Sequence, residues 1–265
     1  MIRFFDGGMG SMLNLAAGEL PEKLNISEPE RVFAVHKGYA DAGAEFITAN
    51  TFGANSLKYD NVDELVKAGV ALAKKAGKYV ALDIGPTGKL LKPMGDLEFE
   101  RAVELFAEVV RAGKDGSDVA IIETMSDMYE LKAAVIAVKE NSDLPIITSM
   151  IFDESGRLLT GGDVKSAVAM LEGLRVDAIG FNCGLGPKQM IPLVKELREC
   201  TSLPILVMPN AGLPESVDGK TVYNVSPDEF AQDMREIAKL GVSILGGCCG
   251  TTPKHIAKML SLIHI

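Results

Sequence analysis

The sequence lacks the features that would direct it to a polyanion or into a membrane. Its 265 residues include 27 lysines and arginines against 36 aspartates and glutamates, a formal net charge of −9 with no basic cluster. A chain this acidic is not expected to bind nucleic acid. The longest apolar runs, such as 203–208, are far too short to cross a bilayer, so no membrane partner is expected either.

Cysteine and histidine are also scarce. There are four cysteines and three histidines, and residues 1–6 do not begin the extended apolar region of a secretory signal. We therefore expect a cytoplasmic protein, in which thiols serve metals or catalysis rather than disulfides. His36, His255 and His264 all lie in predicted helices and are not expected to be metal ligands.

Short apolar runs alternate along the chain with longer amphipathic stretches. Strands that are apolar on both faces and separated by helices are typical of a parallel sheet built from βα units. Eight such units predict an α/β fold, a (β/α)8 TIM barrel, with residues 1–265 as one domain. The predicted strands are 3–5, 46–49, 79–82, 119–122, 145–150, 178–181, 204–208 and 243–245. The clearest helical patterns are 29–42, 96–115, 127–141, 187–200 and 227–240.

Helix-boundary residues support this arrangement. The segments 27–30 and 226–229 each combine serine with proline and an acid, which predicts a serine N-cap followed by proline in the first turn. Gly43, Gly77 and Gly241 follow predicted helices, where a left-handed residue commonly ends the helix.

Polar or chemically reactive residues stand where the apolar runs end. In a barrel the carboxyl ends of the strands meet at one mouth, where active sites lie. At any single position, the alternative to a site residue is an ordinary polar loop residue. The whole set, with its thiols and acids, favours a site; it comprises Asp6, Asn50, Asp83, Glu123, Asp153, Asn182, Cys183, Asn210, Cys248 and Cys249.

Three of these residues suggest a metal centre. Cys183 follows the sixth predicted strand and Cys248-Cys249 follow the eighth, so they should be neighbours across the mouth. Glycines at 246, 247 and 250 let the backbone turn sharply around the pair. Three thiolates predict a zinc site with one open position, which is typical of catalysis. The alternatives are buried cysteines that act as small hydrophobes, or a vicinal disulfide; Cys200 is assigned to packing.

The charge of such a site indicates its chemistry. Three thiolates on Zn²⁺ leave a net charge of −1, which is unfavourable for polarising a carbonyl or activating water. A fourth, substrate thiol would lose its proton on binding and become an electron-rich nucleophile. A site of three cysteines therefore suits thiol alkylation better than hydrolysis.

Seven motifs follow one another along the chain: Asp6-Gly7-Gly8-Met9-Gly10-Ser11, Thr48-Ala49-Asn50-Thr51-Phe52-Gly53-Ala54-Asn55, Asp83-Ile84-Gly85-Pro86-Thr87-Gly88, Glu123-Thr124, Phe181-Asn182-Cys183, Pro209-Asn210-Ala211-Gly212 and Gly246-Gly247-Cys248-Cys249-Gly250-Thr251-Thr252-Pro253. With these motifs in this order, the sequence resembles the homocysteine S-methyltransferase family over almost its whole length. It is most similar to the homocysteine-binding zinc module of cobalamin-dependent methionine synthases.

The resemblance implies an enzyme that binds homocysteine as a zinc thiolate and methylates it to methionine. It carries the zinc ligands over to the three cysteines of the predicted mouth. Gly7 and Gly8 would offer backbone N–H groups to the substrate carboxylate, while Asp6 and Glu123 would face its ammonium group. Alternatively, Asp6 is a turn or cap residue and Glu123 an ion-pair partner.

The other residues of these motifs have less specific roles. Asn50 and Thr51 are expected to line the substrate pocket, and Asp83 to shape it. The amide oxygen of Asn210 would fill the fourth zinc position until a thiol displaces it; the alternative is an ordinary turn asparagine.

The methyl donor is the least defined part of the prediction. Similarity to methionine synthases favours a methyl-corrinoid protein, with methylcobalamin on a separate protein or domain. S-methylmethionine or betaine is the alternative donor, and a different thiol is the alternative acceptor. A rival of another class is a non-catalytic thiol- or amino-acid-binding subunit with structural zinc. The folate, cobalamin and reactivation modules of those synthases have no counterpart in this sequence, as expected for an excised module or a free-standing enzyme.

Overall fold

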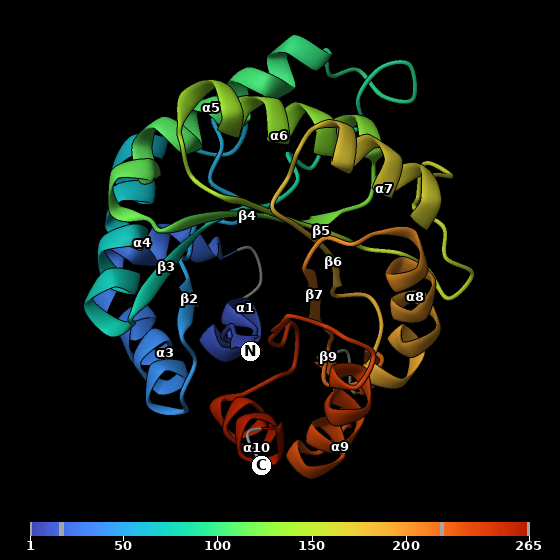
Figure 1. Cartoon of the computed structure of the whole chain (residues 1–265). Coiled ribbons are helices and arrows are strands. Elements are labelled where there is room, and N and C mark those ends of the chain that lie inside the picture. Colours follow the sequence, from blue (N-terminus) through green and yellow to red (C-terminus); the bar gives the residue numbers. More distant parts are fainter. Residues whose placement is uncertain (1, 16–18, 218–219, 264–265) are drawn as a thin grey trace.

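The computed structural model describes residues 2–15, 19–217 and 220–263. The eight barrel strands are β1 (Arg3–Phe4), β2 (Phe46–Thr48), β3 (Tyr79–Ile84), β4 (Val119–Met125), β5 (Ile146–Met150), β6 (Ala178–Asn182), β7 (Ile205–Met208) and β10 (Ile244–Leu245). All are parallel, in the order β1-β10-β7-β6-β5-β4-β3-β2, and a bridge between Phe5 and Phe46 joins the outer two. This bridge closes the sheet, so the predicted (β/α)8 barrel is confirmed (Figure 1).

Helices surround this barrel and cover the outer faces of its strands, whereas the short helix α1 (Met9–Leu13) lies inside the ring of helices, at the mouth (Figure 1). The other helices are α2 (Leu24–Ser27), α3 (Pro29–Asp41), α4 (Val62–Ala76), α5 (Phe99–Gly113), α6 (Met128–Asn141), α7 (Val164–Gly173), α8 (Pro187–Cys200), α9 (Pro227–Ala238) and α10 (Pro253–Ile263), with 3-10 turns η1 (Pro21–Lys23) and η2 (Lys114–Gly116). The five predicted helices are α3, α5, α6, α8 and α9. Helix α5 begins three residues later than predicted, because Leu97 still bridges to Leu91.

Side chains alternate along each strand between the barrel interior and the helix layer. The interior cluster includes Phe5, Ala81, Ile121 and Leu206, whereas the larger cluster lies between the strands and the helices. Ala81 and Ile121 are the last apolar interior residues of β3 and β4, so the polar side chains that follow on the inward face of these strands stand above the apolar layer, toward the mouth.

Of the two predicted serine N-caps, the structure confirms one and contradicts the other. Ser226 forms a capping box at α9, accepting from the Glu229 N–H at 3.3 Å, as predicted. The prediction for Ser27 is wrong. Ser27 is the last residue of α2, its hydroxyl donates back to the Lys23 carbonyl at 3.1 Å, and Glu28 precedes α3 instead.

Of the three glycines predicted to end helices in a left-handed conformation, two are confirmed and one is not. Gly43 and Gly241 are left-handed, with φ of 100° and 80°. Gly77 has φ −119°, so the prediction of a left-handed residue there is wrong. A Cβ at Gly77 would lie 2.2 Å from Ile47 Cγ1, so close packing of α4 on β2 is what requires glycine there.

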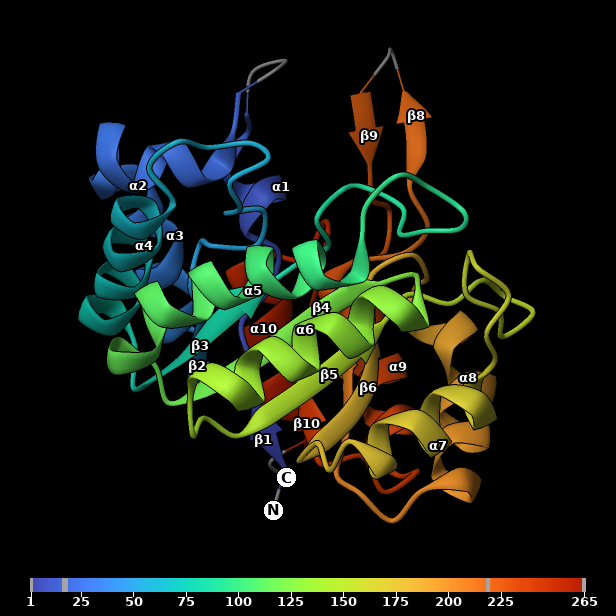
Figure 2. The same ribbon diagram turned by 90° about the horizontal axis from the view of Figure 1, so that it is seen from above.

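A feature that the sequence did not predict stands above the mouth. Strands β8 (Glu215–Val217) and β9 (Lys220–Val222) form a two-stranded antiparallel hairpin between β7 and α9. Figure 2 shows this hairpin projecting from the end of the molecule opposite the termini. Within the described ranges, none of the helices is both long and apolar enough to span a bilayer.

His36 should make the free energy of unfolding depend on pH. It is fully buried in α3, neither ring nitrogen bonds to a described residue, and burial lowers its pKa to about 4. The unfolded state takes up the proton near pH 6.5, so the folded state should lose about 3 kcal/mol as pH falls from about 6.5 to about 4. We expect His36→Leu to raise Tm more at pH 5 than at pH 8, by thermal unfolding; equal shifts would contradict this.

Candidate metal centre

The predicted site residues meet around a cavity of about 370 Å³ at the carboxyl ends of the strands. Strands β3 and β4 run further than predicted, so Asp83 and Glu123 lie within them rather than after them. Thr51 and Asn210 do not line the cavity. The predicted residues that do line it are Asp6, Gly7, Gly8, Asn50, Asp83, Glu123, Cys183, Cys248 and Cys249.

The three cysteines form one cluster. Their sulfur atoms all lie within 4.8 Å of one another, and Cys183 Sγ is 3.8 Å from Cys249 Sγ. The cysteines are free thiols, so the alternative of a vicinal disulfide is not observed. Cys200 instead packs on the core formed by the strands and helices.

Backbone contacts hold the two thiol-bearing turns in place. Cys183 has a left-handed φ of 59°, and its N–H donates to the Met208 carbonyl at 3.2 Å. The Cys248 N–H donates to the Pro209 carbonyl at 2.9 Å. Both turns are therefore fixed to the end of β7, and the strained residue at 183 is of the kind found at functional sites.

The spacing of the sulfurs fits a tetrahedral ion. Zinc–sulfur bonds of about 2.3 Å at tetrahedral angles place two sulfurs about 3.8 Å apart, which is the separation of Cys183 and Cys249. Asn210 is 2% exposed, and its Oδ1 accepts no hydrogen bond from a described residue. A buried oxygen without a hydrogen-bond donor is suited to coordinate a metal ion. That Asn210 is the fourth ligand stays a prediction.

The thiols also share their protons unequally. Hydrogen bonds from Cys183 and Cys248 lower the pKa of Cys249 to about 3. Hydrogen bonding to Cys183 and Cys249, together with burial, raises the pKa of Cys248 well above its usual value. Since a metal ion binds thiolates, an ion in this cluster would displace the protons that Cys183 and Cys248 retain.

Carboxyl groups make the rest of the cavity acidic. Burial is the main cause that raises the pKa of Asp6 to about 7 and that of Glu123 to about 8. Burial and the charge of Glu123 raise the pKa of Asp83. The described residues that line the cavity include no lysine, arginine or histidine. Such a cavity favours a ligand that carries a positive charge.

The first loop approaches the cysteine pair closely. The Gly8 N–H donates to Thr251 Oγ1 at 3.1 Å, so this predicted carboxylate donor already has a partner. A Cβ at Gly7 would lie 2.5 Å from Thr251 Oγ1, and one at Gly8 would lie 2.6 Å from the Cys248 carbonyl oxygen. The two glycines therefore allow this loop to pack against the metal-binding turn.

We expect Gly8→Ala to displace the Cys248 carbonyl and to weaken metal binding about 10-fold or more, an effect of the size seen when the supports of metal ligands are removed. Gly10→Ala is the matched control, because a Cβ there meets nothing within 4 Å. Titration of the metal-free proteins with zinc checks this. Equal zinc affinity in the two variants would contradict the steric argument.

Other predicted positions stabilise the walls. The Asn50 amide donates at 2.8 Å to the Pro21 carbonyl and to Asn25 Oδ1. Thr51 is buried and donates to the Asp83 carbonyl at 2.8 Å. Whether either touches a substrate stays a prediction.

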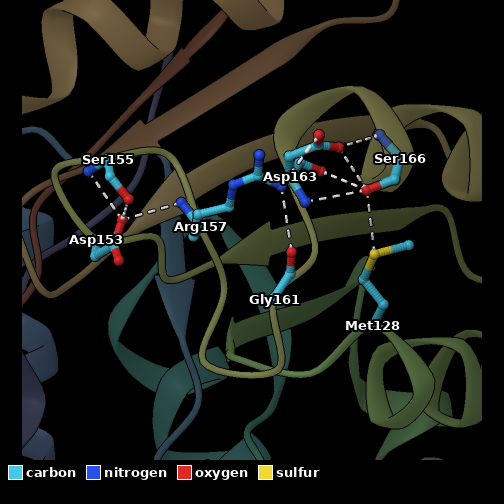
Figure 3. A network of polar contacts seen from close by, with 7 residues as sticks. All are labelled: Met128, Asp153, Ser155, Arg157, Gly161, Asp163 and Ser166. Atoms are coloured by element: carbon cyan, nitrogen blue, oxygen red, sulfur yellow. Dashed lines mark hydrogen bonds and ion pairs between the residues drawn. The ribbon is translucent and has the colours of Figure 1, made fainter.

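Asp153 does not reach the cavity. Its Oδ1 accepts from the Ser155 N–H, the Ser155 hydroxyl and the Arg157 N–H at 2.8, 2.7 and 3.0 Å. Figure 3 shows it bonded within its own loop. The side-chain bond to Ser155 is the main cause that lowers its pKa. Asp153 thus organises the β5–α7 loop.

Neither described histidine lines the cavity. His36 is buried in α3, and the ring of His255 bonds to Thr252 and to the Val225 carbonyl. His264 lies outside the described residues.

Tyr223 is a site residue that sequence reasoning missed. It follows β9, its ring packs against Gly250, and its side chain lowers the pKa of Cys249. Burial and the charge of Cys249 raise its pKa. No sequence pattern places Tyr223 at the mouth, because the hairpin that positions this residue is short and polar.

Fold and site together define a barrel enzyme with a three-thiol cluster at its catalytic end. The model of the family described as homocysteine S-methyltransferase matches residues 3–263. The chain belongs to this family of methyltransferases.

Relatives agree with this family, and a solved structure shares the fold. Methionine synthases of Mycobacterium leprae (strain TN) and Mycobacterium tuberculosis (strain ATCC 25618 / H37Rv) are each 32% identical over 289 residues, covering 97% of this chain. The chain spans only 24% of their length. The metallated form of the homocysteine methyltransferase MmuM from Escherichia coli has the same fold, with TM-score 0.83, 23% identity, and coverage of 98% of this chain and 96% of that one.

Proposed function

We propose that this protein methylates the sulfur of homocysteine to form methionine, with the acceptor held by the cysteine cluster and the carboxyl groups of one cavity. The observation that carries this is the cluster itself, with two sulfurs 3.8 Å apart at the mouth of a barrel of this family. The metallated state of the Escherichia coli enzyme supports a metal here. Zinc on Cys183, Cys248 and Cys249 would keep a substrate thiol deprotonated at neutral pH.

The rest of the cavity binds and orients the amino-acid end. Glu123 receives the ammonium group, and Asp6 adds negative charge beside it while Thr48 fixes its position at 2.8 and 2.6 Å. In the first loop the Gly7 N–H faces the carboxylate, because the Gly8 N–H already donates to Thr251 Oγ1. With both ends held, the sulfur is oriented toward the donor, so proximity supplies much of the rate.

The transfer is a displacement at carbon. The substrate thiolate forms a bond to the methyl carbon as the bond from that carbon to the donor breaks. The nucleophile is already anionic, so this step requires no side-chain base. A methyl-corrinoid protein is the proposed donor because the mycobacterial relatives are methionine synthases. Betaine or S-methylmethionine is the alternative.

The test is to supply the zinc-loaded protein and homocysteine with methylcobalamin, S-methylmethionine or betaine, and to measure methionine. We expect methionine only when zinc, homocysteine and a donor are all present. Protein that takes up no zinc near one equivalent, and forms no homocysteine-dependent product when zinc is added, would overturn the proposal.

A further inference from the structure

The Thr251 side chain lies between the first loop and the cysteine turn, two parts of the site that come from opposite ends of the chain. Its hydroxyl donates to the Cys248 carbonyl at 2.6 Å and accepts from the Gly8 N–H at 3.1 Å. Thr251 is fully buried, so bulk water does not compete for either bond. Because a hydroxyl has one proton and two lone pairs, it can donate to one segment while it accepts from the other.

Tyr39 of α3 forms a second bridge between the same two segments. Its hydroxyl lies 2.8 Å from the Thr251 carbonyl oxygen and 3.2 Å from the Gly8 carbonyl oxygen, within donating distance of both. The tyrosine is fully buried as well. Gly8, Tyr39 and Thr251 thus form one closed hydrogen-bond network, to which Cys248 is joined by its carbonyl group.

Glycines on both sides bring the backbone close to the Thr251 hydroxyl. A Cβ at Gly7 would lie 2.5 Å from Thr251 Oγ1, and a Cβ at Gly247 would lie 2.6 Å from the same atom. The other side-chain bond between the two segments, from the Gly250 N–H to Ser11 Oγ, is exposed, so water can replace it. The buried hydroxyl of Thr251 is therefore the contact that leaves the loop and the turn least freedom to move separately.

The two segments bind different ends of the proposed substrate. The turn carries Cys248 and Cys249, two of the three proposed zinc ligands, and the loop carries the Gly7 N–H that faces the carboxylate. Because Gly7 directly precedes Gly8, the bond from the Gly8 N–H to Thr251 also holds the backbone that carries the Gly7 N–H. Order imposed on the turn by a metal ion therefore extends to the loop, and a carboxylate bound at the loop acts on the turn in return.

We propose that the Thr251 hydroxyl is a positioning group that couples the two halves of the site, so that metal binding at the turn and carboxylate binding at the loop strengthen each other. This inference rests on the proposed function, since it takes an amino acid as the ligand of the loop. Thr251 does not itself line the cavity. It acts on the ligands only through the Gly8 N–H and the Cys248 carbonyl.

The test measures how zinc changes the affinity for L-norleucine, an amino acid that has no sulfur and so cannot bind the metal as a thiolate. Calorimetry gives this affinity for the metal-free and the zinc-loaded full chain. We expect zinc to raise it about 5-fold or more in the wild type, the lower end of typical couplings between sites. In Thr251→Val, which keeps the shape and loses the hydroxyl, the ratio should fall to about 1, and zinc affinity should fall about 10-fold or more.

Two variants separate this coupling from a general loss of stability. Thr251→Ser keeps the hydroxyl and should keep the wild-type ratio. Thr148→Val is the matched control, because Thr148 is also fully buried and donates to a backbone carbonyl, that of Ala178 at 3.1 Å, but does not line the cavity. It should lower Tm and keep the ratio. A ratio that persists in Thr251→Val would arise from charge alone and would overturn the coupling, as would a wild-type ratio of 1.

A further variant serves if Thr251→Val does not fold. Tyr39→Phe removes only the second bridge and should also lower the ratio; an unchanged ratio in this variant would count against the network. Failure of the proposed function gives a different result. Wild-type protein that shows the coupling but forms no methionine with any donor would refute the transfer reaction and leave the coupling intact, whereas protein that binds no norleucine would refute both.

Discussion

Replacing Cys248 by serine should lower methyl transfer to homocysteine at least about 100-fold and leave the barrel folded. Loss of a residue that merely supports a ligand costs 10- to 100-fold, and loss of the ligand itself should cost no less. A serine hydroxyl stays protonated where a thiol ionises, so it cannot replace the third sulfur. The pairing of β10 ends at Leu245, before the cysteine turn, so the sheet does not depend on this sulfur.

The measurements are zinc content, Tm and methionine formation on the same preparation. Cys200→Ser is the control, because Cys200 is also a partly buried free thiol but packs away from the cluster. Cys248→Ser that unfolds together with loss of zinc would favour the structural-zinc subunit instead. Wild-type zinc content and turnover in this variant would remove Cys248 from the ligand set.

The barrel could be predicted because its determinants are local. Runs such as 119–122 are apolar on both faces and separated by helical patterns, and only a sheet covered on both sides accommodates them. The thiol cluster could be predicted from the topology, because the carboxyl ends of all the parallel strands of a barrel meet at one mouth. The hairpin 215–222 lacks such a signal because its strands are short and stand outside the core.

The finer errors arise where tertiary contacts override local preference. Gly77 is required by the side chain of Ile47 and not by a left-handed turn. Ser27 belongs to the helix before the one it was expected to cap. The distinction between Asp6 and Asp83 also depends on distant partners, since Thr48 occupies one carboxyl and leaves the other free. The single-domain reading of residues 1–265 and the cytoplasmic location stay predictions.

Asn182 connects the metal centre to the sheet more directly than any pattern in the sequence indicated. Its Oδ1 accepts from the Thr124 N–H and the Ser149 hydroxyl, both at 2.8 Å. Its Nδ2 donates to Thr124 Oγ1 at 2.7 Å and lies 3.9 Å from Cys248 Sγ. Thr124 has φ 59° at a register shift in β4, so the amide holds a strained bulge directly after Glu123.

Asn182→Ala should therefore destabilise the protein by about 2–4 kcal/mol, because it leaves the partly buried Thr124 N–H and the buried Ser149 hydroxyl without partners. For a chain of this size that corresponds to a fall in Tm of roughly 5–15 °C. Thermal unfolding checks this, with Asn224→Ala as the control at an exposed asparagine. A fall no larger than in that control would contradict the network.

Asn182→Asp separates the two roles of this amide. The carboxylate can still accept from Thr124 and Ser149, so most of the stability should remain. It cannot donate to Thr124 Oγ1 or toward Cys248, and it places a negative charge beside the thiols. We therefore expect zinc affinity to fall about 10-fold or more with a smaller loss of Tm than in Asn182→Ala. Because the acceptor side of the amide holds the bulge and the donor side faces the cysteines, equal zinc affinity in Asn182→Asp and wild type would show that the amide serves the fold alone.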